Sequence, residues 1–185
     1  MPAQATAFTR DFLAPLTGAI GVPLWAVQLT DGWHLSLSCL LGWSLLALAL
    51  IDLRRFLLPD LLTLPLLVAG LGIACLHDRA TLVSALTGAA AGFIAFAVIR
   101  EAYWRLRRRE GLGFGDVKLL AALGAWLGWI SLPSVVLIAC LSALAATCLS
   151  ARFGRLVAAD QKLAFGAHLA LGGWLVWLYG PLGLP

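Results

Sequence analysis

The longest uncharged run of the chain, residues 119–151, constrains the fold more than any other feature. It holds 33 residues without an Asp, Glu, Lys or Arg. As one helix rising about 1.5 Å per residue it would be about 50 Å long, whereas a hydrocarbon core is about 30 Å thick. Two membrane spans must therefore share the run, with Pro133 as the expected corner between them. Residues 119–132 alone are too short to cross, so the first of these spans is expected to begin near Gly115 or Asp116.

Other uncharged runs have the length of about 20 residues that a transmembrane helix needs. They cover residues 12–30, 32–51, 61–77 and 80–99, and a last one follows from about Leu163 to Tyr179. Hydrophobic residues make up 62% of the chain, charged residues only 12%, and the mean hydropathy is +0.95. This composition excludes a soluble globule. We expect an all-α membrane protein of about seven transmembrane helices that forms a single domain over residues 1–185.

The basic residues fall on one side of the predicted membrane. With the N-terminus inside, twelve of the thirteen Lys and Arg residues lie in cytoplasmic segments and only Arg79 lies outside. Many of them occupy the basic loop expected over residues 100–118. Cytoplasmic loops carry such an excess, which predicts an N-in, C-out orientation. The net charge of +4 is thereby explained by the lipid bilayer, and no nucleic-acid partner is expected.

Two aspartates mark the cytoplasmic ends of apolar runs. Asp52 closes one run, and Asp116 follows Gly113-Phe-Gly115 and opens another. Taken alone, Asp52 could pair with a neighbouring arginine at the interface, and Asp116 could cap a helix. The two glycines, however, would let the backbone turn sharply and be approached closely just before Asp116. Acids at a membrane boundary need partners or a water-filled cavity, so this pair indicates a functional site.

Two carboxylates held close together can hydrolyse a peptide bond without a metal or a cofactor. They cannot both ionise easily, so they share a proton, and one acts as base on a water while the other acts as acid towards the carbonyl. Asp116 would lie at a helix N-terminus, where the dipole favours an anion, and Asp52 at a C-terminus, where it does not. We therefore expect Asp116 to be the ionised base and Asp52 the protonated acid.

Three further polar residues have simpler expected roles. Asp60 follows Pro59 and is expected to be the N-cap of the third span, although it could contact a basic substrate segment. Lys118 follows Asp116 by two residues and faces another side of the helix, as an anchor or a charge-tuning residue. His168 has no acidic or cysteine neighbour at ligand spacing and is expected to be packed or to line a cavity.

Three segments resemble the membrane domain of the type IV prepilin peptidases, which are relatives of the Gly-x-Gly-Asp intramembrane aspartyl proteases. The segments are residues 49–60, 113–118 and 165–173, and the likeness covers nearly the whole chain. It implies that Asp52 and Asp116 are the catalytic pair. It also implies the substrates, which are type IV prepilins or type II secretion pseudopilins. These would be cut at the cytoplasmic face of the bacterial inner membrane, between a basic leader and a hydrophobic helix.

Two departures from the family pattern matter. Larger members carry a cytoplasmic domain with two cysteine pairs, linked to N-methylation, whereas this chain has no Cys-x-x-Cys; N-methyltransferase activity is therefore not expected. The family's late motif commonly reads Pro-Phe-Gly-Pro, whereas residues 164–167 read Ala-Phe-Gly-Ala, which leaves the packing near Phe165 open.

Two other functions fit the residues without the resemblance. One is a small ion-coupled transporter or channel that uses the two aspartates as a relay, and the other is a non-catalytic membrane scaffold. Relays need acids near the bilayer midplane, whereas Asp52 and Asp116 lie at the rim. The intact pair also argues against a scaffold.

Overall fold

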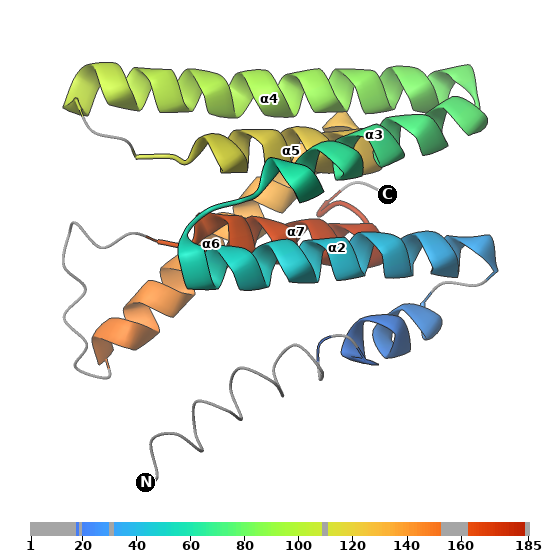
Figure 1. The fold of residues 1–185 in the computed structure, drawn as a ribbon, viewed down its shortest axis with the longest axis horizontal. Helices are drawn as coiled ribbons and strands as arrows, with labels where there is room; N and C mark the ends of the chain where they lie inside the picture. The colour runs from blue at the N-terminus through green and yellow to red at the C-terminus, as the bar shows by residue number, and fades with distance from the viewer. Residues whose placement is uncertain (1–17, 19, 30–31, 109–110, 153–162, 184–185) are drawn as a thin grey trace, which may run out of the picture.

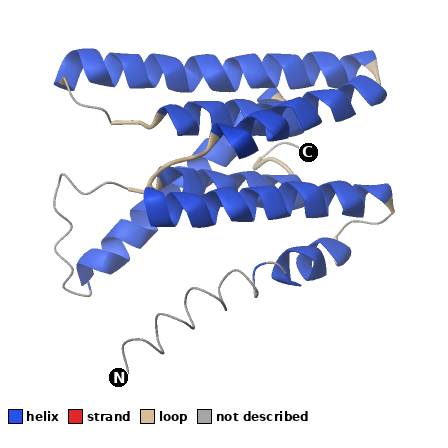
Figure 2. Cartoon of the chain, in the orientation of Figure 1, coloured by secondary structure: helices blue, strands red, loops and turns tan. Residues whose placement is uncertain are grey.

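The computed structural model describes residues 18, 20–29, 32–108, 111–152 and 163–183, and all regular structure within these ranges is helical (Figure 2). The helices are α2 (Trp33–Arg55), α3 (Asp60–Leu76), α4 (Arg79–Arg107), α5 (Phe114–Leu127), the 3-10 helix η1 (Trp129–Ser131), α6 (Leu132–Arg152) and α7 (Phe165–Tyr179). Successive α-helices run in opposite directions (Figure 1). The C-terminal end of α2 therefore lies at the same end of the bundle as the N-terminal ends of α3, α5 and α7.

Within the described ranges, three stretches are long and apolar enough to cross a membrane, namely α2, α4 and the continuous helix Trp129–Arg152. Helices α3 and α7 are shorter and apolar. The all-helical membrane architecture is thus as predicted. Of the expected first span, residues 12–30, the structure describes residues 18 and 20–29, and residues 18 and 20–27 are helical. The number of spans and their orientation stay predictions.

Helix α5 is the centre of the bundle. It packs against α3, α4 and α7, and most of its residues are buried, including the fully enclosed side chains of Leu119, Leu120 and Leu123. A helix that is apolar on every side is expected where other helices surround it. Asp116 is therefore carried by the most enclosed helix that the structure describes.

Small residues let α4 approach α5 closely, and the sequence spaces them as Gly-xxx-Gly at Gly88–Gly92 and Gly124–Gly128. A methyl group added to Gly88 would collide with the backbone of Gly124, and one added to Gly124 would collide with that of Gly88. One turn further along, a methyl group on Gly92 would lie 2.7 Å from the carbonyl oxygen of Leu120. The glycines therefore have a packing role here, which is the close contact that small residues permit between membrane helices.

The corner in the long uncharged run lies at Gly128, and its predicted place at Pro133 is wrong. Gly128 ends α5 with a φ of 76°, in the left-handed region that glycine adopts without steric cost. Pro133 lies in the first turn of α6, where the missing N–H has no helical partner to lose.

The basic loop expected over residues 100–118 is also shorter than predicted, because α4 continues to Arg107. The charged end of this helix is supported by an ion pair one turn apart, in which Arg105 Nε lies 2.7 Å from Glu101 Oε1. Such pairs stabilise exposed helical turns. Charge excludes this stretch from lipid but does not exclude helix.

Candidate active site

Asp52 lies in the last turn of α2 and is buried, with 5% of its surface exposed. The helix ends here because Phe56 takes up the left-handed conformation, and its N–H donates to the Asp52 carbonyl oxygen over 2.8 Å. The Asp52 side chain accepts a hydrogen bond at Oδ2 from the N–H of Ala167, 3.0 Å away in the first turn of α7. The carboxylate is thus held by a helix that is remote in sequence.

Asp116 is the third residue of α5 and is 8% exposed. The N-cap of this helix is Gly113, so the alternative that Asp116 is the N-cap is wrong. Neither Gly113 nor Gly115 has a positive φ, which means that no sharp glycine turn is needed here. Close approach does occur, because a methyl group on Gly115 would lie 2.7 Å from Leu58 Cβ.

The two carboxylates converge on Gly166. A methyl group added to Gly166 would lie 2.9 Å from Asp52 Oδ2 and 3.0 Å from Asp116 Oδ1, so both oxygens border one space above the backbone of α7 that is too small for a carbon atom. The pair is close enough to interact electrostatically. Helix α7 packs against both α2 and α5 and so joins the two helices that carry the aspartates.

Leu58, in the connection between α2 and α3, borders the same space. A methyl group on Gly166 would lie 2.8 Å from Leu58 Cδ1. Beside this connection is an open groove of about 730 Å³ whose wall includes Arg55, Leu57 and Asp60. The buried carboxylates therefore lie next to a groove that begins on an exposed, partly charged surface.

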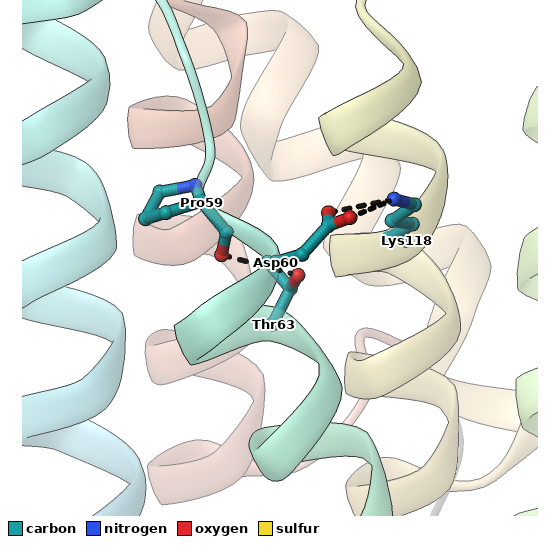
Figure 3. Close-up of polar contacts among 4 residues, drawn as sticks. All are labelled: Pro59, Asp60, Thr63 and Lys118. Carbon is teal, nitrogen blue, oxygen red and sulfur yellow. Dashed lines mark hydrogen bonds and ion pairs between the residues drawn. The ribbon is translucent and has the colours of Figure 1, made fainter.

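Asp60 pairs with Lys118 at this end of the bundle (Figure 3). The Nζ of Lys118 lies 2.6 Å and 2.7 Å from the two carboxylate oxygens of Asp60 and 4.8 Å from the centre of the Phe114 ring. The N-cap of α3 is Pro59, without a side-chain cap, so the N-cap prediction for Asp60 is wrong. The two residues instead tie α3 to α5.

Comparison with known proteins decides the family. The model described as "Type IV leader peptidase family" matches residues 39–149, a range that includes both aspartates. The chain belongs to this family. The leader peptidase relatives with curated names include a "Prepilin leader peptidase/N-methyltransferase" of Aeromonas salmonicida (strain A449), which is 41% identical over 183 residues, 96% of this chain and 60% of the relative.

Two more leader peptidase relatives carry the same name. That of Aeromonas hydrophila is 42% identical over 89% of this chain and 56% of its own length, and that of Dickeya chrysanthemi is 50% identical over 74% and 48%. The chain therefore spans less than two thirds of each of these relatives. No solved structure matches it.

His168 follows Gly166 and Ala167 on α7. Its Nδ1 lies 3.0 Å from Ser142 Oγ, and the same hydroxyl donates to the carbonyl oxygen of Ala139 over 3.0 Å. The direction of the hydrogen bond between Ser142 and His168 depends on the tautomer of the imidazole. His168 is thus packed against α6, as expected from the sequence. Among the described residues, no group of three His, Cys, Asp or Glu side chains is placed to hold a metal ion.

Reasoning from the residues alone missed the part that α7 takes in the candidate site. Gly166 acts because it has no side chain, and Ala167 acts through its backbone N–H. Neither property can be recognised from the chemical type of a residue in the sequence. Leu58 was missed because one leucine among many apolar residues carries no signal. The Phe165-Gly166 pair, which follows a charged break between two apolar runs, was the one available hint.

Proposed function

We propose that this chain is a membrane-embedded aspartyl endopeptidase that removes the basic leader from type IV prepilins or type II secretion pseudopilins at the cytoplasmic face of the membrane. The observation that carries the proposal is the convergence of two buried carboxylates, Asp52 and Asp116, beside Gly166. Membership of the leader peptidase family and the names of the relatives support the reaction and the substrate class.

The chemistry follows from the pair. One carboxylate takes a proton from a water as that water attacks the peptide carbonyl, and the other donates a proton to the reacting group. Asp116 lies in the first turn of its own helix, and Asp52 receives the Ala167 N–H from the first turn of α7. Each carboxylate thus lies at the N-terminal end of a helix, where negative charge is stabilised. The helix dipoles therefore give no reason to place the shared proton on Asp52 rather than on Asp116. The proton belongs to the pair.

Gly113, Gly115, Asp60 and Lys118 support the pair in this proposal. Gly113 begins the α5 turn that carries Asp116, and Gly115 lets Leu58 approach. The ion pair between Lys118 and Asp60 fixes α3 against α5 beside them. In this proposal, none of these four residues takes part in proton transfer.

The proposed topology is a single domain of seven spans, N-in and C-out, in the bacterial cytoplasmic membrane. The site-bearing end of the bundle also carries the basic ends of α2, α4 and α6, whereas Arg79 begins α4 at the opposite end. Large apolar side chains are exposed along the helices, for example Leu61 at 83% and Leu76 at 86%, which is the surface that lipid covers. The site end would then face the cytoplasm.

The relatives are also named methyltransferases, and we propose that the residues described here carry only the peptidase reaction. Four cysteines are present and none forms a Cys-x-x-Cys pair. The transporter alternative is not favoured, because both acids lie at helix ends on one side of the bundle rather than along a path through it.

The test is cleavage of a prepilin substrate in detergent or in membranes by wild type, Asp52→Asn and Asp116→Asn at equal folded amounts. Each substitution removes one member of the acid–base pair, so cleavage should fall by at least about 100-fold. Asp78→Asn is the matched control, because Asp78 lies at the opposite end of α4, and it should cleave as wild type does. Substantial cleavage by either dyad variant would refute the assignment of the pair.

A further inference from the structure

The first turn of α7 lies beside both aspartates and donates a main-chain hydrogen bond to Asp52. Its Ala167 N–H lies 3.0 Å from Asp52 Oδ2. The adjoining Gly166 leaves open the space that both carboxylate oxygens border. Gly166 itself is buried, so this space is enclosed by the protein. Two neighbouring residues therefore contact the reacting pair without contributing a functional side chain.

The Ala167 N–H is available because the first N–H groups of a helix have no intrahelical acceptor. A hydrogen bond to a charged group is stronger than one between neutral groups. Proline has no N–H, so a chain with proline at this position, as in the Pro-Phe-Gly-Pro pattern, cannot make this bond. Any residue other than proline has a backbone N–H at position 167, and in this chain alanine supplies it to Asp52.

Gly166 meets a steric requirement that no other residue satisfies. A methyl group at this position would lie within 3.0 Å of Asp52 Oδ2, Asp116 Oδ1 and Leu58 Cδ1. Leu58 can move, since the contact is with the far end of a flexible side chain. The two carboxylates have less freedom, because Asp52 is fixed by Ala167 and Asp116 lies in the buried first turn of α5. Alanine at 166 would therefore push the pair apart.

We propose that Gly166 and the backbone N–H of Ala167 are positioning residues of the reaction. The N–H orients the Asp52 carboxylate towards Asp116, and the bare Cα of Gly166 allows the two to share one water and one proton. This inference rests on the proposed peptidase function and on the Asp52–Asp116 pair. The ionisable groups that act on Asp52 in the structure are Asp116 from α5 and His168 from α7.

The decisive variant is Ala167→Pro, which removes the N–H in the first turn of a helix, where proline is tolerated best. Its matched control is Ala164→Pro. Ala164 is the N-cap of α7, its φ of −73° suits proline, and the substitution leaves the Ala167 N–H in place. The kcat, the KM and the pH–rate profile are measured for prepilin cleavage with both variants and with wild type.

Loss of the Ala167 N–H destabilises negative charge on the pair, and it leaves the Asp52 carboxylate less firmly oriented. We expect the kcat of Ala167→Pro to fall roughly 10- to 100-fold, with little change in KM, and the acidic limb of its pH profile to move up by about one pH unit. The profile of Ala164→Pro should keep the wild-type limbs. The folded fraction of each variant is measured at every pH and the rates are divided by it, so that loss of folded protein in acid is not mistaken for a moved limb.

Gly166→Ala provides an independent arm. Its control is Gly72→Ala on α3, where an added methyl group meets nothing within 4 Å. The kcat of Gly166→Ala should fall at least about tenfold with little change in KM, because a displaced pair affects the chemical step, whereas the control should be unchanged.

The outcomes separate this inference from the function on which it rests. If wild type cleaves, Asp52→Asn does not, and the profiles of Ala167→Pro and Ala164→Pro superimpose, the positioning role is overturned while the proposed function stands. A Gly166→Ala variant with wild-type kcat would overturn the steric part. If wild type cleaves no prepilin, the proposed function fails, and the positioning role fails with it.

Discussion

Lys118 and Asp60 lie 58 residues apart in the chain and form an ion pair at one end of the bundle, with Nζ 2.6 Å and 2.7 Å from the carboxylate oxygens. The Lys118 side chain is 21% exposed and that of Asp60 is 57% exposed. The pair is therefore partly screened by solvent, and it joins α3 to α5 next to the helix turn that carries Asp116.

For this pair, a double-mutant cycle of Asp60→Asn and Lys118→Gln should give a coupling of about 0.5 kcal/mol in the free energy of unfolding, measured in detergent. Partly exposed pairs contribute roughly 0.2–1 kcal/mol. The exposed pair Glu101–Arg105 on α4 is the control cycle and should give no more than the Asp60–Lys118 pair. Additive effects of Asp60→Asn and Lys118→Gln would contradict the pairing.

Gly124→Ala should destabilise the protein by about 1–3 kcal/mol, because the added methyl group would meet the backbone of Gly88 and force α4 and α5 apart. Thermal unfolding in detergent measures the loss. Gly72→Ala makes the same chemical change in open space and should not lower the melting temperature. Equal stability of the two variants would mean that the helices do not touch at Gly124.

Asp78, in the turn before α4, should make stability depend on acid pH. Hydrogen bonds from the side chain and the backbone N–H of Thr81 lower the pKa of Asp78 below its usual value. Because the folded-state pKa is the lower one, its contribution is complete above the unfolded pKa of about 4 and disappears as the pH falls through the folded pKa. The difference in melting temperature between wild type and Asp78→Ala should therefore be larger at neutral pH than in acid.

The control for this pH dependence is Asp78→Asn. An asparagine still accepts the Thr81 N–H as an N-cap but does not titrate. Its difference from Asp78→Ala should persist in acid, and a difference that disappears there would rule out titration of Asp78 as the cause.

Ser142→Ala and His168→Ala should each cost about 1 kcal/mol of stability, since each removes the hydrogen bond between α6 and α7. Prepilin cleavage by both should stay well above that of the dyad variants, because the His168 Nδ1 is already committed to Ser142. If His168→Ala abolished cleavage while Ser142→Ala did not, His168 would instead take part in the chemistry.

The sequence was sufficient to predict the pair of aspartates, because charge is rare in an apolar chain and two acids at the ends of spans are conspicuous. Composition likewise predicted a helical membrane protein. The glycines spaced four residues apart in α4 and α5 are typical of helices that approach closely, although the same spacing also arises because glycine is frequent in membrane helices. These features depend on local sequence or on strong exclusion from lipid.

The parts that sequence could not predict depend on backbone atoms and on which helices become neighbours. Helix α5 ends at Gly128 because glycine can adopt the positive φ that the corner needs. Pro133 does not form the corner, because proline is acceptable in the first turn of a helix. Helix α7 packs against both α2 and α5, and its Gly166 lies beside the carboxylates of these two helices. No pattern in a strongly apolar helix such as α7 shows which of its faces meets which neighbour.

The position of α7 between the two helices that carry the aspartates has a consequence for biogenesis. The ribosome makes α2 and α5 before α7, so both carboxylates can enter the membrane while the helix that aligns them is still unmade. A nascent chain would then be inert towards the pilin precursors inserting beside it, and proteolytic competence would arise only when α7 is integrated. The order of the helices along the chain would in this way delay the onset of cleavage until assembly is nearly finished.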